Sequence, residues 1–266
     1  MQNCSVIIVN YNTGDLLKKA VDAAILNKSV YEVIVVDNNS SDGSMDLLKE
    51  SDQLKKYFRN KNYGFASSCN FAANLSSSRI LVFLNPDCIV NQDSIDSLIS
   101  VIKNKKNAAI IGCHVTNPDG TEQRASRRRL PTFIRALKTL TRIEKLAKIC
   151  HCFAGVNLNH HSMPKSVITV EAISGALIMM KVNVFIELNG FDDKYPLHFE
   201  DLDLFKRTLN EGYDILFEPN VSVIHHQGTS SQSNPRVAQF KKIGIKRYFE
   251  KHASKISSLI VNLISR

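Results

Sequence analysis

The sequence predicts an α/β protein with a mostly parallel central sheet and helices on both of its faces. Three features support this class. Short apolar runs alternate with amphipathic helical segments through the first half of the chain. The runs have the length of a strand and lack polar alternation, which is typical of strands buried on both faces. Each run ends at a polar turn followed by a helix, an order that joins parallel strands through crossover helices.

The strands of the first half are predicted from runs of Val, Ile, Leu and Phe, and the helices from apolar residues that recur three and four positions apart. In chain order these elements are a strand over residues 5–9, a helix over 16–25, a strand over 33–36, a short helix from Met45, a helix over 64–75, a strand over 80–84 and a helix over 95–102. Asp15 and Asn91 stand where the N-caps of two helices are expected. Asn85, Pro86 and Asp87 follow the strand at 80–84, so we expect Asp87 at the mouth of a crevice that opens where a parallel strand ends.

The second half is less regular but continues the same pattern. Its predicted elements are strands over residues 167–173 and 177–180, a helix over 184–188 that Gly190 ends, a helix from Glu200 to Gly212, and short strands over 215–217 and 221–224. The helix at Glu200 carries Leu202, Phe205 and Leu209 on the face expected to pack inward. No repeat, low-complexity tract or linker divides the sequence, so we expect one domain.

The composition is that of a globular protein with a sizeable core, since 44% of its 266 residues are hydrophobic and 22% are charged. The N-terminus shows no basic leader and no long apolar run, so we expect no signal peptide, no membrane-spanning helix and a cytoplasmic location. The six cysteines are scattered, mostly within apolar runs, as expected for reduced thiols. Cys150-His151-Cys152, with His160 and His161 beyond, matches no zinc-binding spacing.

Basic charge is concentrated in two segments. The net charge is +9, and residues 121–150 and 236–266 each carry +7, which leaves −5 for the rest of the chain. This segregation indicates an anionic surface or substrate near those segments rather than uniform binding to nucleic acid. Residues 133–147 and 256–264 have the pattern of amphipathic helices. Basic helices of this kind bind anionic membranes, and packing on the protein's own core or on a partner subunit is the alternative.

Polar side chains follow three predicted strands, at the edge where parallel strands end. They are Asn10, Tyr11 and Asn12 after the first strand, Asp37 and Asn38 after the second, and Asn85 and Asp87 after the strand at 80–84. Because these ends meet at one edge of the sheet, we expect one crevice. Asp37 can accept the imide N–H of uracil or thymine, Tyr11 can cover the base, and Mg²⁺ or Mn²⁺ on Asp87 can hold a diphosphate. Helix capping and a simple turn are the alternatives, and the lack of a GxGxxG sequence argues against a dinucleotide fold.

Glu200 and Asp201 stand together at the start of a predicted helix, where the helix dipole favours an ionised carboxylate. An ionised carboxylate can act as a general base toward a sugar hydroxyl, which contributes roughly 10²–10⁴-fold in rate. Helix capping is the alternative role. His225 follows a predicted strand and can supply an imidazole to the same cation as Asp87, and a packed or exposed histidine is the alternative there.

Eight motifs in this order resemble glycosyltransferase family 2, and more narrowly the bacterial rhamnosyltransferases of polysaccharide synthesis. The motifs are Val9-Asn10-Tyr11-Asn12, Val35-Val36-Asp37-Asn38-Asn39-Ser40, Asn62-Tyr63-Gly64-Phe65 with Asn70, Leu84-Asn85-Pro86-Asp87, Ser174-Gly175-Ala176, Gly190-Phe191-Asp192, Glu200-Asp201-Leu202-Asp203-Leu204 and Val223-Ile224-His225-His226-Gln227-Gly228-Thr229-Ser230. The resemblance implies a GT-A fold over residues 1–248. It divides this fold into a nucleotide-binding half at 1–115 and an acceptor and catalytic half at 116–235, and it leaves a C-terminal amphipathic helix at 249–266.

The resemblance also implies roles for individual residues. Asp37 matches the family's base-binding acid. Asp87 matches the metal-binding acid of its DxD-type motif, whose first acid is replaced here by Asn85, so we expect weak metal binding without nucleotide. Asp201 matches the catalytic base of a Glu-Asp pair that Glu200 completes, and His225, rather than His226, matches a histidine that reaches the metal. The other residues expected at the site are Val9, Tyr11, Asn62, Gly64, Asn70 and Asn85 for the nucleotide, and Ser174, Gly175, Ala176 and Arg128 for the sugar or acceptor.

The implied reaction is an inverting transfer of a sugar from a nucleoside diphosphate to a hydroxyl, with Mg²⁺ or Mn²⁺ as cofactor. The expected donor is dTDP-rhamnose, and the expected acceptor is an O-antigen or capsule-type glycan on a polyprenyl diphosphate. We expect a peripheral protein on the inner face of the cell membrane, with no nucleic-acid partner and with a homodimer left open. The alternatives are a UDP-hexose or UDP-N-acetylhexosamine donor and a non-catalytic nucleotide-sugar-binding module. A nucleotidyltransferase is disfavoured because no Gly-rich phosphate loop follows the first strand.

Overall fold

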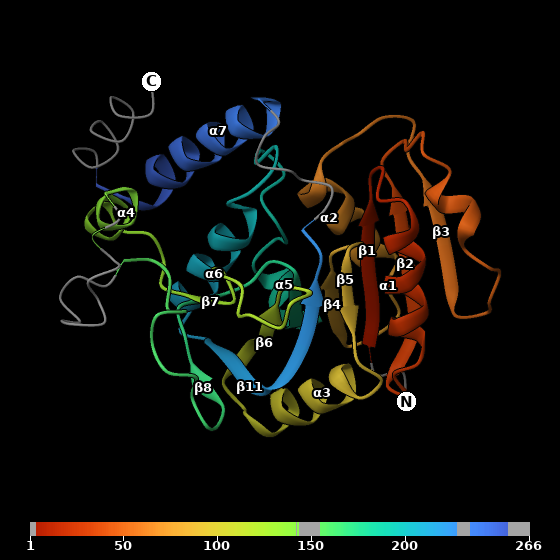
Figure 1. Ribbon diagram of the computed structural model, residues 1–266, viewed down its shortest axis with the longest axis horizontal. Coiled ribbons are helices and arrows are strands. Elements are labelled where there is room, and N and C mark those ends of the chain that lie inside the picture. The colour runs from red at the N-terminus through yellow and green to blue at the C-terminus, as the bar shows by residue number, and fades with distance from the viewer. Residues whose placement is uncertain (1–3, 142, 144–154, 228–234, 255–266) are drawn as a thin grey trace.

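A nine-stranded sheet runs through the centre of the molecule (Figure 1). The computed structural model describes residues 4–141, 143, 155–227 and 235–254. In sheet order the strands are β3 (Leu54–Phe58), β2 (Val30–Asp37), β1 (Cys4–Asn10), β4 (Ile80–Leu84), β10 (Leu177–Lys181), β6 (Ala108–Thr116), β11 (Asp214–His225) and β5 (Cys88–Val90), with β8 (Ile168–Thr169) paired to β11. A separate two-stranded sheet pairs β7 (Arg127–Arg128) with β9 (Ala172–Ile173).

The strands of the first half are parallel, as the alternation of strands and helices predicts. β1 pairs in parallel with β2 on one side and with β4 on the other, and β3 extends the sheet beyond β2. β6 and β11 are also a parallel pair. β10 is antiparallel to both β4 and β6, and β5 is antiparallel to β11. The mostly parallel α/β class predicted from the sequence is therefore confirmed.

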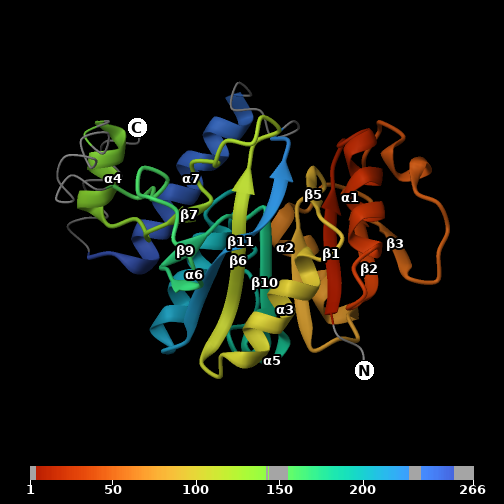
Figure 2. The ribbon, with the colours of Figure 1, turned by 60° about the horizontal axis from the view of Figure 1, so that its bottom comes forward.

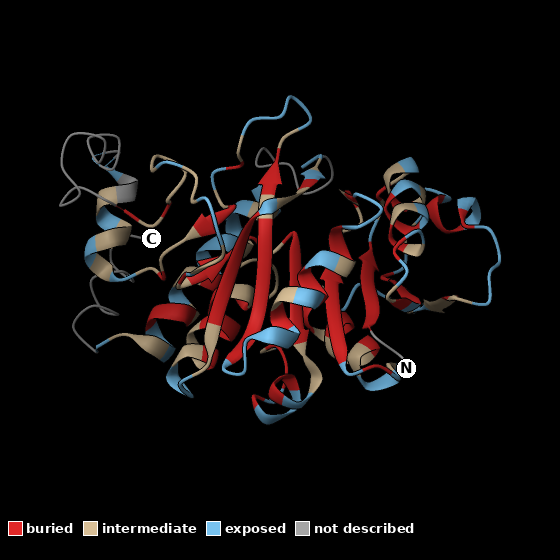
Figure 3. Cartoon of the chain, turned by 90° about the horizontal axis from the view of Figure 1, so that it is seen from below, coloured by how far each residue is buried: buried red, intermediate tan, exposed pale blue. Residues whose placement is uncertain are grey.

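Helices cover both faces of this sheet. They are α1 (Asp15–Ile25), the 3-10 helix η1 (Ser44–Leu47), α2 (Phe65–Leu75), α3 (Ser94–Asn104), α4 (Phe133–Leu140), α5 (Val182–Glu187), α6 (Glu200–Asn210) and α7 (Pro235–His252). Alternate side chains of β1 enter two cores, because successive residues of a strand point to opposite faces. Val6 and Ile8 belong to the core beneath α1 and α3, whereas Ile7 and Val9 belong to the core shared by α2, α5, α6 and α7. Figure 2 shows α1 and α3 on the near side of the sheet, and Figure 3 shows the central strands buried.

Two predicted N-caps are wrong by one or two residues. Asp15 is the first residue of α1, and Gly14 holds the N-cap position with a φ of 62°. That positive φ costs glycine little and a β-carbon-bearing residue much more, which explains why the acid lies inside the helix. The N-cap of α3 is Asp93 rather than Asn91. Neither difference changes where the helices pack.

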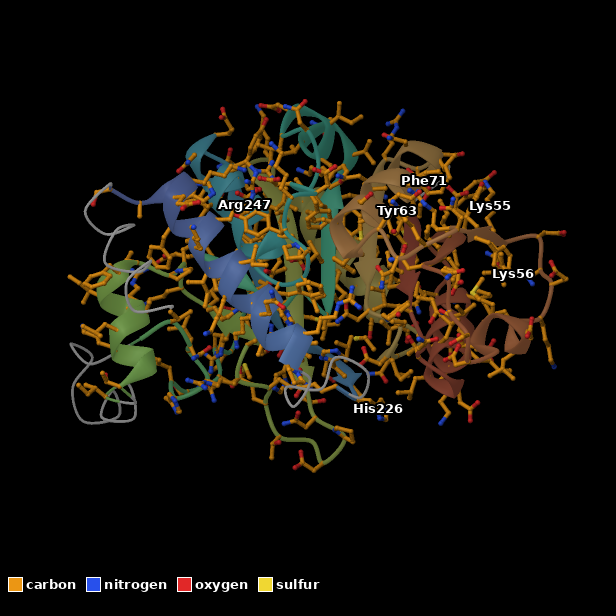
Figure 4. The ribbon with its side chains drawn as sticks, turned by 90° about the horizontal axis from the view of Figure 1, so that it is seen from above. Lys55, Lys56, Tyr63, Phe71, His226 and Arg247 are labelled. Carbon is orange, nitrogen blue, oxygen red and sulfur yellow. The ribbon has the colours of Figure 1, made fainter. Side chains whose placement is uncertain are left out.

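The two short strands predicted at residues 215–217 and 221–224 are one strand, β11. Its register with β6 shifts between Glu218 and Ser222, and Pro219, which has no N–H to donate, lies in that interval. β3, β5, β6, β7 and α7 are not among the elements predicted from the sequence. The single strand predicted over 167–173 is two short strands, β8 and β9, which belong to different sheets. β3 lies at the edge of the sheet and carries Lys55 and Lys56 (Figure 4), so it lacks the continuous apolar run of the other strands.

Several expectations fall partly outside the described residues. Of the amphipathic helix predicted over 133–147, the structure describes α4, whereas the Cys150-His151-Cys152 segment and the amphipathic residues 256–264 lie outside. Cys4, Cys69, Cys88 and Cys113 are buried and free, as expected for reduced thiols. Within the part of the chain that the structure describes, no helix is long and apolar enough to cross a membrane.

Candidate active site

Asp37 closes β2 at the edge where β1, β2 and β4 end, and its carboxylate is buried and held from two sides. The ladder places Asn10 of β1 directly beside it. Asn10 Nδ2 donates to Asp37 Oδ1 at 2.8 Å, and the backbone N–H of Ser40 donates to Asp37 Oδ2 at 2.9 Å. The structure therefore brings together Asn10 and Asp37, two of the strand-end residues that the sequence predicts would meet, and it fixes the orientation of the acid.

Two exposed tyrosines stand on the loops next to Asp37. Tyr11 follows β1 and is 47% exposed, and Tyr63 precedes α2 and is 39% exposed. The Arg59 guanidinium lies 4.3 Å from the ring centre of Tyr63 and 4.5 Å from that of Phe71 (Figure 4), which holds the Tyr63 loop against α2. Asn38 joins this loop to Asp37, because its Nδ2 donates to the carbonyl of Gly64 at 3.2 Å. Two flat side chains thus remain accessible beside a fixed acid.

The other residues predicted for the nucleotide have partners within the protein. Asn62 Oδ1 accepts the N–H of Gly64 at 2.8 Å, and Val9 is buried in the core. Asn70 Nδ2 donates to the carbonyl of Phe191 at 2.8 Å, and Asn70 Oδ1 accepts the N–H of Phe191 at 2.9 Å. In the structure, Asn70 holds the backbone of Phe191 against α2. A nucleotide contact by Asn70 stays a prediction.

Asp87 and His225 lie side by side at the end of the sheet. Asp87 stands in the turn between β4 and β5, and β5 pairs with the end of β11 so that His225 faces Cys88 in the ladder. Asp87 Oδ1 and His225 Nε2 are 3.1 Å apart. The backbone N–H of His226, which Figure 4 labels, donates to the carbonyl of Asp87 at 3.0 Å. Both expected metal ligands are therefore neighbours, although 138 residues of sequence separate them.

The second ring nitrogen of His225 meets Gln123, a residue that the sequence did not single out. His225 Nδ1 is 2.9 Å from Gln123 Oε1, and Gln123 Nε2 donates to the carbonyl of His225 at 2.7 Å. Gln123 is 2% exposed and lies in the loop after β6. In the sequence it is one polar residue in a basic loop, and no pattern there marks it.

The donor atoms at this point suit a divalent cation that is also bound by a nucleotide. A carboxylate oxygen and an imidazole nitrogen at hydrogen-bond distance are both metal ligands, and carboxylate oxygens suit Mg²⁺ and Mn²⁺. Among the described residues, no group of three or more His, Cys, Asp or Glu is close enough to hold a metal ion. With Asp87 and His225 as its protein ligands, such a cation would need further oxygen donors from outside this pair. Weak metal binding without nucleotide stays a prediction.

Glu200 opens α6 in an environment that favours its neutral form. Burial, and next the charge of Asp201, raise the pKa of its carboxyl to about 8. Glu200 Oε2 is buried and has no hydrogen-bond partner among the described residues. The residues before it, His198 and Phe199, have φ values of 66° and 73°, a left-handed conformation that is strained for side chains of this size. The strained turn at His198 and Phe199 therefore leads directly into the acidic pair Glu200 and Asp201.

Asp201 makes an ion pair with Arg128, although 73 residues separate them in the chain. Arg128 Nη2 donates to Asp201 Oδ2 at 2.6 Å and to the carbonyl of Ile173 at 2.8 Å. Both side chains of the ion pair are 14% exposed. Arg128 Nε is buried without a hydrogen-bond partner among the described residues. Arg128 thus lies at the acidic pair.

The segment Ser174-Gly175-Ala176 connects the acidic pair to the strand ends. The carbonyl of Ala176 accepts the N–H of Asn85 at 2.9 Å. A β-carbon added at Gly175 would lie 3.1 Å from Asp201 Oδ2, closer than an ordinary van der Waals contact. Three consecutive residues therefore link the turn that carries Asp87 to Asp201, and the glycine permits the close approach. One segment thus contacts both groups of predicted residues.

A second acid of α6 fastens that helix to α7. Asp203 is fully buried and accepts from Arg207 Nε at 2.8 Å, Lys251 Nζ at 2.8 Å and His252 Nε2 at 2.7 Å. The hydrogen bonds from His252 and Lys251, and the nearby Arg207 charge, lower the pKa of Asp203 against the opposing effect of burial. Asp192 accepts from Arg247 of α7 at 2.6 Å (Figure 4). These contacts give Asp203 and Asp192, two acids of the predicted motifs, a structural role in holding α7 rather than a catalytic one.

One pocket lies apart from these residues. It has a volume of about 280 Å³ between the start of α4 and the end of α7. Its lining residues are Leu130, Pro131, Thr132, Phe133, Glu171, Lys206, Tyr248, Phe249, His252, Ala253 and Ser254. None of the residues predicted for the site lines it.

Comparison with known sequences identifies the family. Residues 5–161 match the family model described as Glycosyl transferase family 2. The rhamnosyltransferase WbbL of Escherichia coli (strain K12) is 25% identical over 242 residues, which cover 86% of this chain and 85% of that protein. The N-acetylglucosaminyl-diphospho-decaprenol L-rhamnosyltransferase of Mycobacterium tuberculosis is 22% identical over 248 residues, which cover 86% of this chain and 78% of that protein.

Comparison with solved structures identifies the fold. The mannosyltransferase PcManGT from Pyrobaculum calidifontis, in complex with GDP-Man and Mn²⁺, superposes with a TM-score of 0.64 at 15% sequence identity. The match covers 99% of this chain and 69% of that one. At this identity the likeness shows the fold, and it confirms the GT-A architecture that the sequence resemblance implies.

Proposed function

The chain belongs to glycosyltransferase family 2 and is a glycosyltransferase, and we propose that it transfers L-rhamnose from dTDP-rhamnose, with inversion, to a lipid-linked glycan. Two relatives support the donor, because both are named as rhamnosyltransferases. The name of the mycobacterial relative also specifies a polyprenyl-diphosphate acceptor. We propose an acceptor of the same class, an O-antigen or capsule-type glycan carried on a polyprenyl diphosphate.

The observation that carries this proposal is the short link from Asp87 to Asp201. Through the segment Ser174-Gly175-Ala176, the Asn85–Asp87 turn contacts the start of α6. A group that holds the diphosphate of a donor and a group that deprotonates an acceptor must lie within one sugar's width of each other for direct displacement. The contacts of Ala176 with Asn85 and of Gly175 with Asp201 support that arrangement.

We assign the roles of base and neutral partner from the electrostatics of the acidic pair. Because the pKa of Glu200 is raised to about 8, Glu200 is neutral near pH 7. The acid of the pair that bonds to the Arg128 guanidinium is Asp201. Asp201 then takes the proton of the acceptor hydroxyl while Arg128 holds its Oδ2. Since the hydroxyl attacks from the side opposite the leaving nucleoside diphosphate, the anomeric configuration inverts.

On the donor side, Asp37 accepts from the base and Tyr11 covers it, while Asp87 and His225 hold the divalent cation. A bound Mg²⁺ or Mn²⁺ ion supplies positive charge to the departing diphosphate. The PcManGT complex with GDP-Man and Mn²⁺ supports a metal of this kind. We propose residues 1–115 as the nucleotide-binding half of the domain and 116–235 as the acceptor half.

The proposed workplace is the inner face of the cell membrane. Ile134 and Leu137 of α4 are 63% and 43% exposed, and they lie in the basic segment 121–150. Exposed apolar side chains among basic residues are typical of a surface that meets anionic lipid. This proposal makes the protein a peripheral one that collects its acceptor from the bilayer.

A panel of nucleotide-sugars tests the donor. The purified protein is incubated with dTDP-rhamnose, UDP-galactose or UDP-N-acetylglucosamine, with Mn²⁺ or with excess chelator, and release of nucleoside diphosphate is measured. We expect metal-dependent release from dTDP-rhamnose. Release from a UDP-sugar alone would replace the rhamnose proposal by the UDP-donor alternative, and full activity in chelator would remove the cation from the mechanism.

Asp201→Asn tests the base. The variant keeps the size of the side chain and removes its capacity to accept a proton, so we expect turnover to fall by roughly 10²–10⁴-fold while nucleotide affinity changes little. Calorimetric titration with dTDP and Mn²⁺ measures the affinity. A large loss of affinity would show that Asp201 binds the nucleotide and is not the base.

A further inference from the structure

Gln123 is held rigidly next to the proposed metal ligand His225. Its backbone N–H donates to the carbonyl of Val115 at 2.9 Å, and its carbonyl accepts the N–H of Ser126 at 2.9 Å. The side chain is almost fully buried. A buried amide with both backbone groups bonded has little freedom, so its direction is set by the fold rather than by His225.

The two hydrogen bonds from this amide fix its orientation. Gln123 Nε2 donates to the backbone carbonyl of His225 at 2.7 Å, and a carbonyl can only accept. The amide oxygen, Oε1, is therefore the atom that faces His225 Nδ1 at 2.9 Å. An oxygen at that distance requires a proton on Nδ1. Gln123 thus selects the form of His225 that carries its hydrogen on Nδ1.

A contact on the opposite side of the ring agrees with this assignment. Asn85 Nδ2 lies 3.2 Å from His225 Nε2. Because an amide nitrogen is a donor, it requires a lone pair on Nε2 rather than a hydrogen. The two contacts together direct Nδ1 toward Gln123 and Nε2 toward Asn85 and Asp87.

We propose that Gln123 is a positioning residue that locks His225 in the Nδ1–H tautomer and so presents Nε2, beside Asp87, as a metal ligand. The inference rests on the proposed metal role of Asp87 and His225. It adds a residue from a separate loop, after β6, to a site otherwise built from β4, β5 and β11.

The position of Asp87 explains why such a lock is needed. A carboxylate oxygen 3.1 Å from a ring nitrogen would ordinarily draw a proton onto that nitrogen, or turn the ring so that an N–H faces the acid. Either change removes the lone pair that binds metal. Gln123 opposes both changes. Its Oε1 accepts the hydrogen on Nδ1, and this hydrogen bond also keeps the ring from turning. Outer partners of metal-binding histidines commonly act in this way.

The tautomer can be observed directly. Histidine labelled with ¹⁵N gives different ring nitrogen signals for the Nδ1–H and Nε2–H forms, and His225→Gln identifies the signal of His225. For the neutral ring of wild-type His225, we expect the Nδ1–H form, because Gln123 Oε1 faces Nδ1. We expect Gln123→Met, which matches the side chain in size and removes both bonds, to lose that preference. Wild-type protein in the Nε2–H or doubly protonated form would overturn the inference.

Metal affinity measures the consequence. Free Mn²⁺ is followed by electron paramagnetic resonance in the presence of dTDP or UDP. We expect Gln123→Met to weaken Mn²⁺ binding by roughly 10- to 100-fold, the range found when an outer partner of a metal ligand is removed. Gln123→Glu keeps an acceptor for Nδ1–H, so we expect it to recover most of the affinity. Unchanged Mn²⁺ affinity in Gln123→Met would overturn the inference.

Gln53→Met is the matched control. Gln53 also donates to a backbone carbonyl, that of Val30 at 3.1 Å, but at the opposite end of β2 from Asp37. This variant should bind Mn²⁺ as the wild type does, and thermal unfolding shows whether each variant is folded. If wild-type protein with either nucleotide binds no Mn²⁺, the metal role of Asp87 and His225 is wrong. The ¹⁵N signals then still decide whether Gln123 sets the tautomer.

Discussion

Arg128 and Asp201 form the contact on which the proposed base depends. The guanidinium is the one cation bonded to Asp201 among the described residues, and Glu200 adds a second buried carboxyl next to it. A hydrogen bond between charged groups in a mostly buried site contributes about 1.5–3 kcal/mol. The position of the Asp201 carboxylate, and not only its charge, is therefore set by Arg128.

We expect Arg128→Met to lower kcat by roughly 10- to 100-fold, which corresponds to loss of one charged hydrogen bond. Steady-state kinetics with the active donor measure it. Arg135→Met is the control, since it removes a similar ion pair, 2.6 Å from Glu171, away from Asp201. Equal losses in the two variants would show that Arg128 acts on stability alone.

The pKa of Glu200 makes a prediction about pH and stability. The pKa of Glu200 is about 8 in the folded protein, whereas the ordinary value, which we take for the unfolded chain, is 4.5. Between these values the folded state binds one more proton than the unfolded state, so the free energy of unfolding falls as pH rises and levels off above the folded pKa. Relative to Glu200→Gln, we expect the wild type to lose on the order of 2–4 kcal/mol between about pH 5 and about pH 9. Urea denaturation at both pH values measures this, and parallel pH dependence in the two proteins would contradict the raised pKa.

The sequence identifies the acids of the site better than it identifies their partners. Asp37, Asp87 and Asp201 follow from strand ends, a helix start and the order of motifs, which are local features. Arg128 and Gln123 meet their partners across 73 and 102 residues of chain. Which arginine meets Asp201 and which glutamine meets His225 depend on the path of the loops, and no spacing in the sequence encodes that path.

At the scale of elements, α7 supports the turn that delivers the acidic pair. Gly244 of α7 packs on this turn, and a β-carbon there would lie 2.9 Å from the carbonyl of His198 and 3.3 Å from the Phe199 ring. The same turn contains the two left-handed residues before Glu200. α7 therefore reaches the site through the backbone of a strained turn, as well as through the ion pairs of Asp203.

We expect Gly244→Ala to destabilise the protein and to lower kcat. In an ordinary helix interior, Gly to Ala raises the free energy of unfolding by about 0.5–1 kcal/mol. Here we expect overpacking to lower the free energy of unfolding by about 1–3 kcal/mol instead. Urea denaturation and steady-state kinetics measure the two effects. Gln239→Ala, on an exposed position of the same helix, is the control. A more stable Gly244→Ala variant would show that the turn at His198 and Phe199 shifts to make room for the added methyl group without destabilising the fold.

Helices and strands with a clear pattern of apolar residues are predicted from the sequence. Strands that form only because they pair with a neighbouring strand are not. The strand at 80–84 is predicted with its bounds, because five apolar residues end at Asn85-Pro86. β5 has three residues and exists because it pairs with the end of β11, and β3 is a polar edge strand. The missed β5 matters most, since its pairing with β11 is what brings His225 to Asp87.

For the whole molecule, the segregation of charge makes the last prediction. Residues 121–150 and 236–266 each carry +7, against −5 elsewhere, and α4 exposes Ile134 and Leu137 within the first of them. Basic charge draws a protein to anionic lipid, and each Lys or Arg near the surface contributes about 1 kcal/mol. Exposed apolar side chains then add contact with the acyl region.

We expect the protein to sediment with vesicles that contain anionic phospholipid, less so as salt rises, and not with neutral vesicles. Ile134→Ser combined with Leu137→Ser should reduce the bound fraction, because it removes apolar contact and leaves the charge unchanged. Ile186→Ser is the control, since Ile186 is 67% exposed on α5, outside both basic segments. No binding to anionic vesicles would contradict the membrane proposal. Equal binding by the double variant would mean that charge alone draws the protein to lipid and that α4 does not insert.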